Sequence, residues 1–534
     1  MELIKVKVPM VCGLVALLLN LAMPLFAGGH STEISKSSVI RMAPTAPVFD
    51  EKTRLAELAG RRARVAQSIG SKAVLLLFST EPRVYTNDVD YEYRQENNLY
   101  YLTNLKQKGA TLVLTPSNNV LPEILFLPRR NPAAETWTGH MYSPAEASQL
   151  SGIKEIWESS DFEPFIQALH NRQSYRPKPE KILLSSSSSP RDISAASGFE
   201  KLFEAASRNE GELYLLMPGD AKSREYKQEQ SFASEWAKSA SNYSIKNVSP
   251  IFAELRLRKS PLEIALMQHA IDITTEAHER AWVAAEVAKW EYEVDAQVAY
   301  TFKLRNADHW GYPSIVGCGP NATTLHYEES QGPVKLGDLL LMDVGAEYDH
   351  YSADVTRTFP VSGKFSPSQA EIYQIVYDAQ EAGAKVARPG ALVSDVHRAA
   401  TEVIKDGLLK LGLITDRDSN QYRIWFMHGT SHWLGMNVHD VGDYGSRLEP
   451  GMVFTNEPGI YIRPDALDNL PKNAENEKFI AAVGPAFEKY KGIGVRIEDD
   501  MLITPGGVKW MTEALPRKIS DIEDFITRAR RGAR

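Results

Sequence analysis

Two aspartates eleven residues apart, Asp343 and Asp354, constrain the fold of this chain more than any other feature. They lie in LLMDVGAEYDHYSADVTRTFP, where two apolar, β-branched runs flank a polar turn and predict a β-hairpin. A two-residue turn at Tyr348 and Asp349 would place the two aspartates directly opposite each other, with Cβ atoms roughly 4.5–5.5 Å apart. Two carboxylates at that distance repel each other unless a cation lies between them. The hairpin therefore predicts a metal site.

The order of the remaining segments predicts two domains. A chain of 534 residues is too long for a single compact domain. Strand-like runs alternate with charged, helix-like stretches over 51–248, which predicts an N-terminal α/β domain. From 255 to 534 the sequence predicts helices over 261–290, 366–387 and 394–412 and β-rich segments over 338–360, 451–463 and 493–504. Helices followed by strands, twice over, predict an α+β domain.

The N-terminus has the layout of a targeting segment. Residues 1–27 combine two lysines, an apolar run over 11–21 and small residues around Ala27, as secretory signal peptides do. We expect cleavage after Ala27, a flexible polar lead-in over 28–50 and export to the periplasm or the medium. The alternative is an uncleaved membrane anchor, because the apolar segment is just long enough to span a bilayer.

Charge and cysteine content exclude several classes of function. The formal net charge of −8 argues against nucleic acid as the main partner. Removal of the signal segment would remove Cys12 and leave Cys318 as a single thiol, so no internal disulfide is expected. Cys318 lies between glycines, in IVGCGPNA, and a catalytic thiol is not predicted there. The chain also lacks the GxSxG motif of α/β-hydrolases.

Further residues of metal-ligating type occur in the second half. They are His428, His432 and His439 in HGTSHWLGMNVHD, Glu457 in FTNEPGIYI and Glu498 in GIGVRIEDDMLIT. A carboxylate inside an apolar strand is costly unless it is paired or coordinated. Glu498 has an alternative partner in Arg496, two residues away, and each signal is weak alone. Together, four carboxylates and one histidine in a single domain indicate a divalent-cation site.

Four segments resemble the metal-binding motifs of Xaa-Pro aminopeptidases (aminopeptidase P), a family of pita-bread metallopeptidases. They are MDVGAEYDHYSADVTRTFP, HGTSHWLGMNVHDVG, NEPGIYI and GVRIEDD. Upstream, DYEYRQENNLYYLTNL and AETWTGH are similar to the N-terminal domain of the same family. The resemblance implies a C-terminal pita-bread (creatinase/methionine aminopeptidase-like) catalytic domain behind an N-terminal aminopeptidase P-type α/β domain.

The resemblance also implies a dinuclear metal site with five ligands. These are Asp343, Asp354, His432, Glu457 and Glu498. Asp354 and Glu498 would bridge two divalent ions, and the oxygen-rich ligand set favours Mn²⁺ over a structural zinc. A hydroxide held between the ions would attack the carbonyl group of the bond that precedes proline.

Other residues receive roles from the resemblance alone. His326, in ATTLHYEES, and His439 would help to stabilise the oxyanion, and Glu457 would carry a proton to the departing proline nitrogen. His428 and Arg496 would orient the ligands. For the three histidines and Arg496, an ordinary structural hydrogen bond is the alternative interpretation.

The implied function is removal of an N-terminal residue from peptides with proline second. One alternative is prolidase, which is restricted to Xaa-Pro dipeptides and shares the ligands. Another is a non-catalytic peptide-binding module on the same fold. The family also implies a homo-oligomer, dimer or tetramer, with contact to a membrane only through an uncleaved signal segment.

Overall fold

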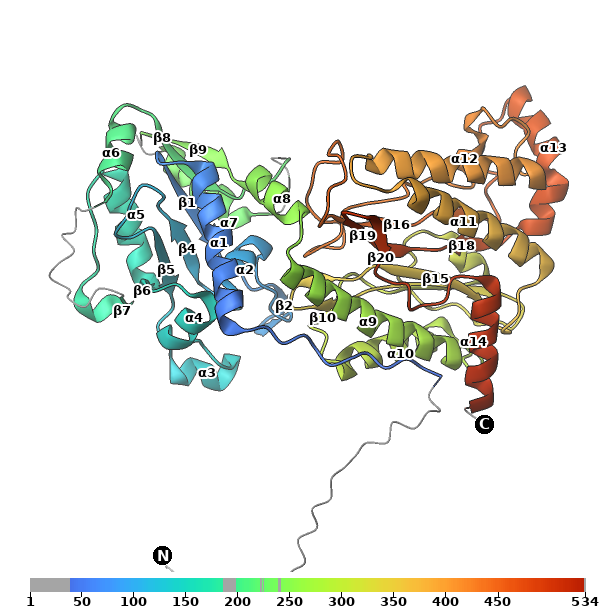
Figure 1. Ribbon diagram of the computed structural model, residues 1–534, viewed down its shortest axis with the longest axis horizontal. Coiled ribbons are helices and arrows are strands. Elements are labelled where there is room, and N and C mark those ends of the chain that lie inside the picture. Colours follow the sequence, from blue (N-terminus) through green and yellow to red (C-terminus); the bar gives the residue numbers. More distant parts are fainter. Residues whose placement is uncertain (1–38, 186–197, 221–222, 224, 239–241, 533–534) are drawn as a thin grey trace, which may run out of the picture. The chain divides into compact units, whose positions relative to one another are not determined.

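The computed structural model describes residues 39–532 apart from 186–197, 221–222, 224 and 239–241 (Figure 1). The expected signal segment, 1–27, and the expected lead-in up to residue 38 lie outside the described residues. Among the helices that the structure describes, none is long and apolar enough to cross a membrane.

The N-terminal part contains a mixed seven-stranded sheet in the order β7-β6-β5-β4-β1-β8-β9. All six residues of β1 are buried, because helices cover both faces of this sheet. The strands of the sheet are β1 (Ala73–Phe78), β4 (Thr111–Leu114), β5 (Glu123–Leu127), β6 (Ile156–Glu158), β7 (Ile182–Leu184), β8 (Gly211–Leu215) and β9 (Tyr243–Asn247). A small hairpin is formed by β2 (Val84–Thr86) and β3 (Val89–Asp90). The helices are α1 (Glu51–Ile69), α2 (Asn97–Thr103), α3 (Pro132–Thr138), α4 (Pro144–Ser151), α5 (Phe162–His170), α6 (Glu200–Ser207), α7 (Lys227–Lys238) and α8 (Ser249–Leu257).

The C-terminal part is built from short antiparallel sheets enclosed by long helices (Figure 1). The sheets are β11-β12-β15, β16-β19-β20, β17-β18 and β10-β13-β14. Their strands are β10 (His309–Trp310), β11 (Ile315–Cys318), β12 (Leu339–Val344), β13 (Ala346–Tyr348), β14 (Tyr351–Ser352), β15 (Val355–Pro360), β16 (Val453–Asn456), β17 (Gly459–Tyr461), β18 (Gly494–Arg496), β19 (Asp499–Thr504) and β20 (Gly507–Trp510). The helices are α9 (Pro261–Ala284), α10 (Glu291–Leu304), α11 (Pro367–Val386), α12 (Val393–Leu411), α13 (Ala474–Tyr490) and α14 (Ile519–Gly532). One apolar cluster joins these helices to β12, β15 and β18, which confirms the expected α+β class.

Local signals explain where the long helices begin. Ser260 and Glu263 form a capping box in front of α9, and Ser366 and Gln369 form another in front of α11. Each helix carries proline at its first position, where the missing N–H leaves no helical bond unmade. The predicted helix over 261–290 ends earlier, at Ala284, because the chain turns there before α10.

Residues 39–50 run across α9. The backbone N–H of Ala43 donates to the carboxylate of Glu276 at 2.8 Å, and the N–H of Arg41 donates to Glu279. Arg305 pairs with Glu276 at 2.7 Å, so this buried carboxylate is fully partnered. The described end of the expected lead-in is therefore attached to α9 of the C-terminal part.

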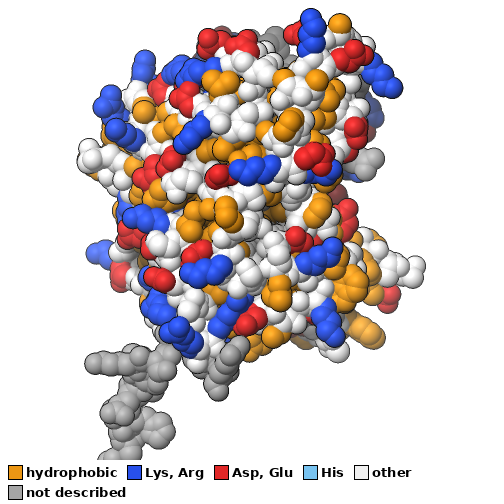
Figure 2. All heavy atoms as spheres, turned by 90° about the vertical axis from the view of Figure 1, so that its right-hand side faces the viewer, with side chains coloured by type: hydrophobic (Ala, Val, Ile, Leu, Met, Phe, Trp, Pro, Cys, Tyr) orange, Lys and Arg blue, Asp and Glu red, His pale blue; other side chains and the backbone are white. Residues whose placement is uncertain are grey.

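The surface that is visible in Figure 2 carries interspersed acidic and basic side chains with small apolar patches between them. No continuous basic field covers this face, in agreement with the net charge of −8.

Candidate metal centre

The hairpin that carries the two aspartates differs by two residues from the predicted register. β13 pairs with β14 through Tyr348 and Tyr351, so the turn residues are Asp349 and His350. Both have positive φ, 50° and 69°, as a type I′ hairpin turn requires. Aspartate and histidine tolerate that conformation better than tyrosine does, which is why the turn lies one residue further along than predicted.

In the observed register Asp343 lies opposite Thr356 rather than Asp354. A shift of two residues keeps both aspartates on one face, because side chains alternate with a period of two. Asp354 follows β14 at an interruption where Gly345 packs against Ala353: a Cβ on Gly345 would lie 1.9 Å from the Ala353 carbonyl oxygen.

The two aspartates still converge, because both lie against the hydroxyl group of Tyr312. The Tyr312 oxygen is 2.5 Å from Asp343 and 2.6 Å from Asp354. A hydroxyl has one proton, so it can donate to only one of these carboxylates at a time. The close approach therefore leaves a negative charge that Tyr312 alone does not neutralise.

His432 points at the remaining carboxylates. Its Nδ1 lies 3.1 Å from the Trp433 carbonyl, which fixes that nitrogen as a donor and turns Nε2 into the site. Nε2 lies 3.2 Å from Asp354, 3.5 Å from Glu457 and 4.0 Å from Glu498. Ligand atoms of Asp354, His432 and Glu498 all fall within 4.8 Å of one another.

Both glutamates occupy interruptions between strands rather than strand interiors. Glu457 lies between β16 and β17, and Glu498 lies between β18 and β19. Thr356 donates to Glu498 at 2.6 Å from the neighbouring β15, and the N–H of Glu498 donates to the Thr356 carbonyl. The prediction that Glu498 lies inside a strand was therefore wrong, although its side chain is buried as expected.

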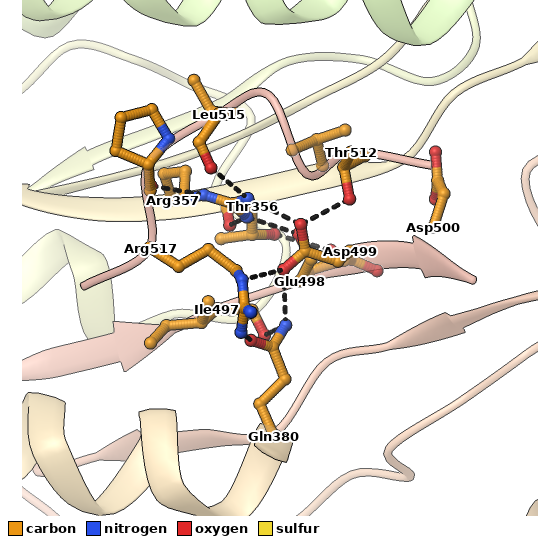
Figure 3. A network of polar contacts seen from close by, with 12 residues as sticks. Thr356, Arg357, Gln380, Ile497, Glu498, Asp499, Asp500, Thr512, Leu515 and Arg517 are labelled. Atoms are coloured by element: carbon orange, nitrogen blue, oxygen red, sulfur yellow. Dashed lines mark hydrogen bonds and ion pairs between the residues drawn. The ribbon is translucent and has the colours of Figure 1, made fainter. Parts of the chain in front are cut away.

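A buried network of polar side chains binds the backbone carbonyls at Ile497 and Glu498 (Figure 3). Arg357, fully buried, donates to the Glu498 carbonyl at 2.7 Å and to the Asp499 carboxylate at 2.6 Å. Gln380 adds bonds to the Ile497 carbonyl and to Asp499. The side chains of Arg357, Gln380 and Asp499 all have partners, so these contacts fix one geometry for the peptide that carries Glu498.

Arg496 pairs with Asp343 rather than with Glu498. Its guanidinium donates to Asp343 at 2.5 Å, to Tyr461 at 2.9 Å and to Thr356 at 3.1 Å. The salt bridge to Glu498 that the sequence left open is not formed, and Arg496 contacts a predicted ligand instead.

The pKa values of three of the four carboxylates are raised, because burial disfavours their charged forms and the site holds more negative than positive groups. Burial raises the pKa of Glu457 to about 7, despite the neighbouring His432 imidazole. Burial also raises the pKa of Asp354 and, together with the charge of Asp354, raises that of Glu498 well above its usual value. Burial opposes ionisation of Asp343 too, but the Arg496 guanidinium lowers its pKa. Burial disfavours charge on His432, yet the hydrogen bond to Asp354 raises its pKa to about 9.

A cleft of about 350 Å³ opens onto these groups. All five predicted ligands line it, and so do the other four predicted functional residues, His326, His428, His439 and Arg496. His428 lies 2.9 Å from the Tyr461 hydroxyl and 3.7 Å from Glu457. His326 and His439 are exposed on the cleft wall, and the His439 ring stands edge-on to that of His432, with centroids 4.3 Å apart.

Several residues at the site were not singled out from the sequence. Tyr312, Tyr461 and Thr356 contact predicted ligands or Arg496, and none of them is distinctive in local sequence. Asp500, two residues after Glu498 in RIEDD, accepts a hydrogen bond from the Asp354 N–H at 3.2 Å and is fully buried. Its adjacency to the predicted ligand was the one available signal.

The donor set fits divalent cations. Four carboxylates, of which Asp343, Asp354 and Glu498 are buried and Glu457 is half-buried, face one cleft together with the His432 imidazole. Among the described residues that line the cleft, Arg496 is the one guanidinium. Hard oxygen donors with one imidazole suit Mn²⁺, Co²⁺, Fe²⁺ or Zn²⁺, and the excess negative charge is what two such ions would neutralise.

Comparison with known families identifies two matching models. Residues 265–505 match "Metallopeptidase family M24", and residues 58–176 match "Aminopeptidase P, N-terminal domain". The two matches fall on the C-terminal and N-terminal sheets respectively.

Individual proteins match over almost their entire lengths. The Xaa-Pro aminopeptidase of Haemophilus influenzae is 35% identical over 481 residues, which cover 88% of this chain and 97% of that protein. The Escherichia coli Xaa-Pro aminopeptidase is 34% identical, with 89% and 98% covered. The structure of an Escherichia coli aminopeptidase P variant in complex with substrate superposes with a TM-score of 0.72 at 31% identity, with 89% and 99% covered.

Proposed function

The chain belongs to the aminopeptidase P family of M24 metallopeptidases, and from this premise we propose that it hydrolyses the bond between an N-terminal residue and a following proline at a dinuclear metal site. The observation that carries the proposal is the convergence of all five predicted ligands on one cleft. Asp343, Asp354, His432, Glu457 and Glu498 would hold the ions, and the oxygen-rich set supports Mn²⁺.

Two divalent cations bound by these residues would supply Lewis-acid chemistry, which polarises a carbonyl group and lowers the pKa of water. This chemistry suits the bond before proline. That bond has no N–H, so a site that recognised the substrate through that proton could not act on it.

Side chains of the protein would transfer a proton from the attacking water to the proline nitrogen. Water adds to the carbonyl carbon, the C–N bond breaks, and the proline nitrogen takes up a proton. Glu457 lines the cleft among the predicted ligands, so it would accept a proton from water there and pass it to that nitrogen. His326 and His439 are exposed and line the cleft, and both would donate to the developing oxyanion.

Room beyond the metal centre supports an aminopeptidase over prolidase. A second cavity of about 570 Å³ adjoins the cleft and shares Tyr312, Pro313 and Val438 with it. A site for dipeptides alone has no use for this extra volume. The non-catalytic alternative is disfavoured because every expected ligand is present.

The decisive experiment is a metal-dependent assay on peptides of increasing length. Purified protein is treated with chelator, reloaded with Mn²⁺, and tested on Arg-Pro-Pro and on Gly-Pro. We expect release of arginine from the tripeptide, loss of activity after chelation, and no activity in Asp354→Ala. The exposed Asp468→Ala serves as the matched control. Cleavage of the dipeptide alone would instead identify a prolidase, and a folded, metal-loaded protein that cleaves neither would indicate a binding module.

We also propose that the protein is exported and forms a homo-oligomer. The composition of residues 1–27 supports export, and the family supports the oligomer. N-terminal sequencing of protein recovered from the cell envelope and the medium tests the first proposal: a start after Ala27 supports it. Sedimentation of the mature protein tests the second.

A further inference from the structure

The loop from Trp433 to Asp440 carries His439 to the cleft and is closed at its base by a backbone bond. The N–H of Asp440 donates to the Trp433 carbonyl at 2.9 Å. The same carbonyl lies 3.1 Å from His432 Nδ1, so the closure of the loop and the orientation of His432 depend on one oxygen atom.

Asp440 is buried between two cations that come from outside this loop. Its Oδ1 accepts from Arg256 at 2.5 Å, and its Oδ2 lies 3.7 Å from the Lys259 ammonium. The side chains of all three are at most 3% exposed. Arg256 belongs to α8, and Lys259 to the connection between α8 and α9.

The cluster extends to the N-terminal part of the chain. Arg256 also donates to Asn98 of α2 at 2.9 Å. On the loop side the fit leaves no spare room, because a Cβ on Gly435 would lie 2.1 Å from Asp440 Oδ2. The loop that bears His439 is thus fastened to residues that do not themselves line the metal cleft.

Net stabilisation does not explain this arrangement. Two cations and one anion withdrawn from water cost several kcal/mol per ion, and such buried clusters are often no more stabilising than apolar side chains of the same volume. Within the described chain, Lys259 Nζ and Asp440 Oδ2 have no hydrogen-bond partner, so part of that cost is not recovered. What the cluster does provide is a fixed position for the loop.

We propose that Asp440, held by Arg256 and Lys259, is a positioning residue that keeps His439 at the metal cleft. The inference rests on the proposed function, since it assumes that His439 acts on the substrate. The alternative is that the cluster serves folding alone.

A double-mutant cycle with Asp440→Asn and His439→Ala distinguishes a positioning role from a role in folding alone. The cycle is measured on the Mn²⁺-loaded full chain with Arg-Pro-Pro as substrate. If Asp440 acts through His439, Asp440→Asn lowers kcat by about 10–100-fold, as loss of such orienting partners does in metal sites. The double variant then falls no more than about twofold below His439→Ala alone. Bound metal stays at the wild-type level.

Conservative replacement of Arg256 supplies a second readout. We expect Arg256→Met to lose activity as Asp440→Asn does, whereas Arg256→Lys, which keeps the charge, recovers most of kcat. The control is Glu123→Gln, which breaks the Arg62–Glu123 pair in the N-terminal sheet and should leave kcat unchanged. If Asp440→Asn does not fold, Lys259→Met takes its place in the cycle, because the Arg256–Asp440 bond survives in that variant.

The inference is overturned if the losses in the cycle multiply, if activity falls in step with bound metal, or if His439→Ala or Asp440→Asn has wild-type kcat. A wild-type protein that cleaves no Xaa-Pro peptide refutes the proposed function itself, and this is measured first. An active wild type with multiplying losses refutes the positioning role alone.

Discussion

Arg496 donates to Asp343 at 2.5 Å, although the two residues are 153 positions apart and Glu498 is only two positions away. The pairing joins β18 to β12 across the two halves of the catalytic fold. It lowers the pKa of Asp343. Among the residues that the structure describes, no guanidinium pairs with Asp354, Glu457 or Glu498. The metal centre is therefore asymmetric in charge before any ion binds.

Arg496→Met should weaken both metal binding and catalysis. Without the guanidinium, Asp343 loses its orienting partner and Tyr461 loses a donor. We expect about a 10–100-fold loss in metal affinity or in kcat. Metal titration and steady-state assays measure the two, with the half-exposed Arg463→Met as control. Unchanged affinity and kcat would show that Arg496 has an ordinary structural role.

Asp354→Asn should abolish activity and yet stabilise the metal-free protein. Asp354 lies beside Asp343, Glu457 and Glu498, and the amide removes one of the mutually repelling buried carboxylates. We expect kcat to fall at least about 100-fold and the melting temperature of the apoprotein to rise, at about 2–4 °C per kcal/mol for a domain of 150–250 residues. Calorimetry after chelation measures the rise. A lower melting temperature for the apo variant would contradict the repulsion on which the metal site is inferred.

Glu279→Gln should remove a pH-dependent loss of stability. Burial raises the pKa of Glu279 from 4.5 to about 7 in the folded protein. A raised pKa means that the folded state binds the proton more tightly, so its contribution is complete below pH 4.5 and is lost as pH rises through about 7. The glutamine is neutral throughout and can still accept the Arg41 N–H.

We therefore expect equal unfolding free energies for wild type and Glu279→Gln at pH 4.5, and a more stable variant at pH 8. The gain should be on the order of 1–3 kcal/mol, since one pKa unit corresponds to about 1.4 kcal/mol. Urea unfolding at both pH values measures it, under conditions where metal content is constant. A variant that is less stable at pH 8 would show that charged Glu279 is needed to hold residues 39–50.

Gly345→Ala should disrupt the metal centre through the backbone alone. Its Cβ would lie 1.9 Å from the Ala353 carbonyl oxygen, so the strand end after Asp343 and the segment before Asp354 must separate. Overpacking of this kind costs about 1–3 kcal/mol or more. We expect a lower melting temperature and reduced metal content by elemental analysis. Gly337→Ala is the control, because a Cβ there meets no atom within 4 Å. Equal metal content in the two variants would show that the crossing can widen without moving the ligands.

The sequence by itself determined which ligating side chains belong to the site and what class of chemistry they serve. The motifs around Asp343, His432, Glu457 and Glu498 each span a few consecutive residues. In each motif a ligating side chain has apolar or glycine neighbours. Strand and helix periodicity in the second half likewise predicted 338–360, 366–387 and 394–412 close to their observed bounds. Such signals lie within one turn or one strand, so a single chain reveals them.

The tertiary structure alone decided which partner each charged group takes. The choice of Asp343 over Glu498 by Arg496, the insertion of Tyr312 between two aspartates, and the pairing of Asp440 with Arg256 all join segments 31 to 184 residues apart. The hairpin register depended on the backbone conformation at Asp349 and His350, where two adjacent turns fit the same pattern of apolar residues. Periodicity specifies the face on which a side chain lies, but its partner depends on how whole elements pack, and that information is spread over the entire fold.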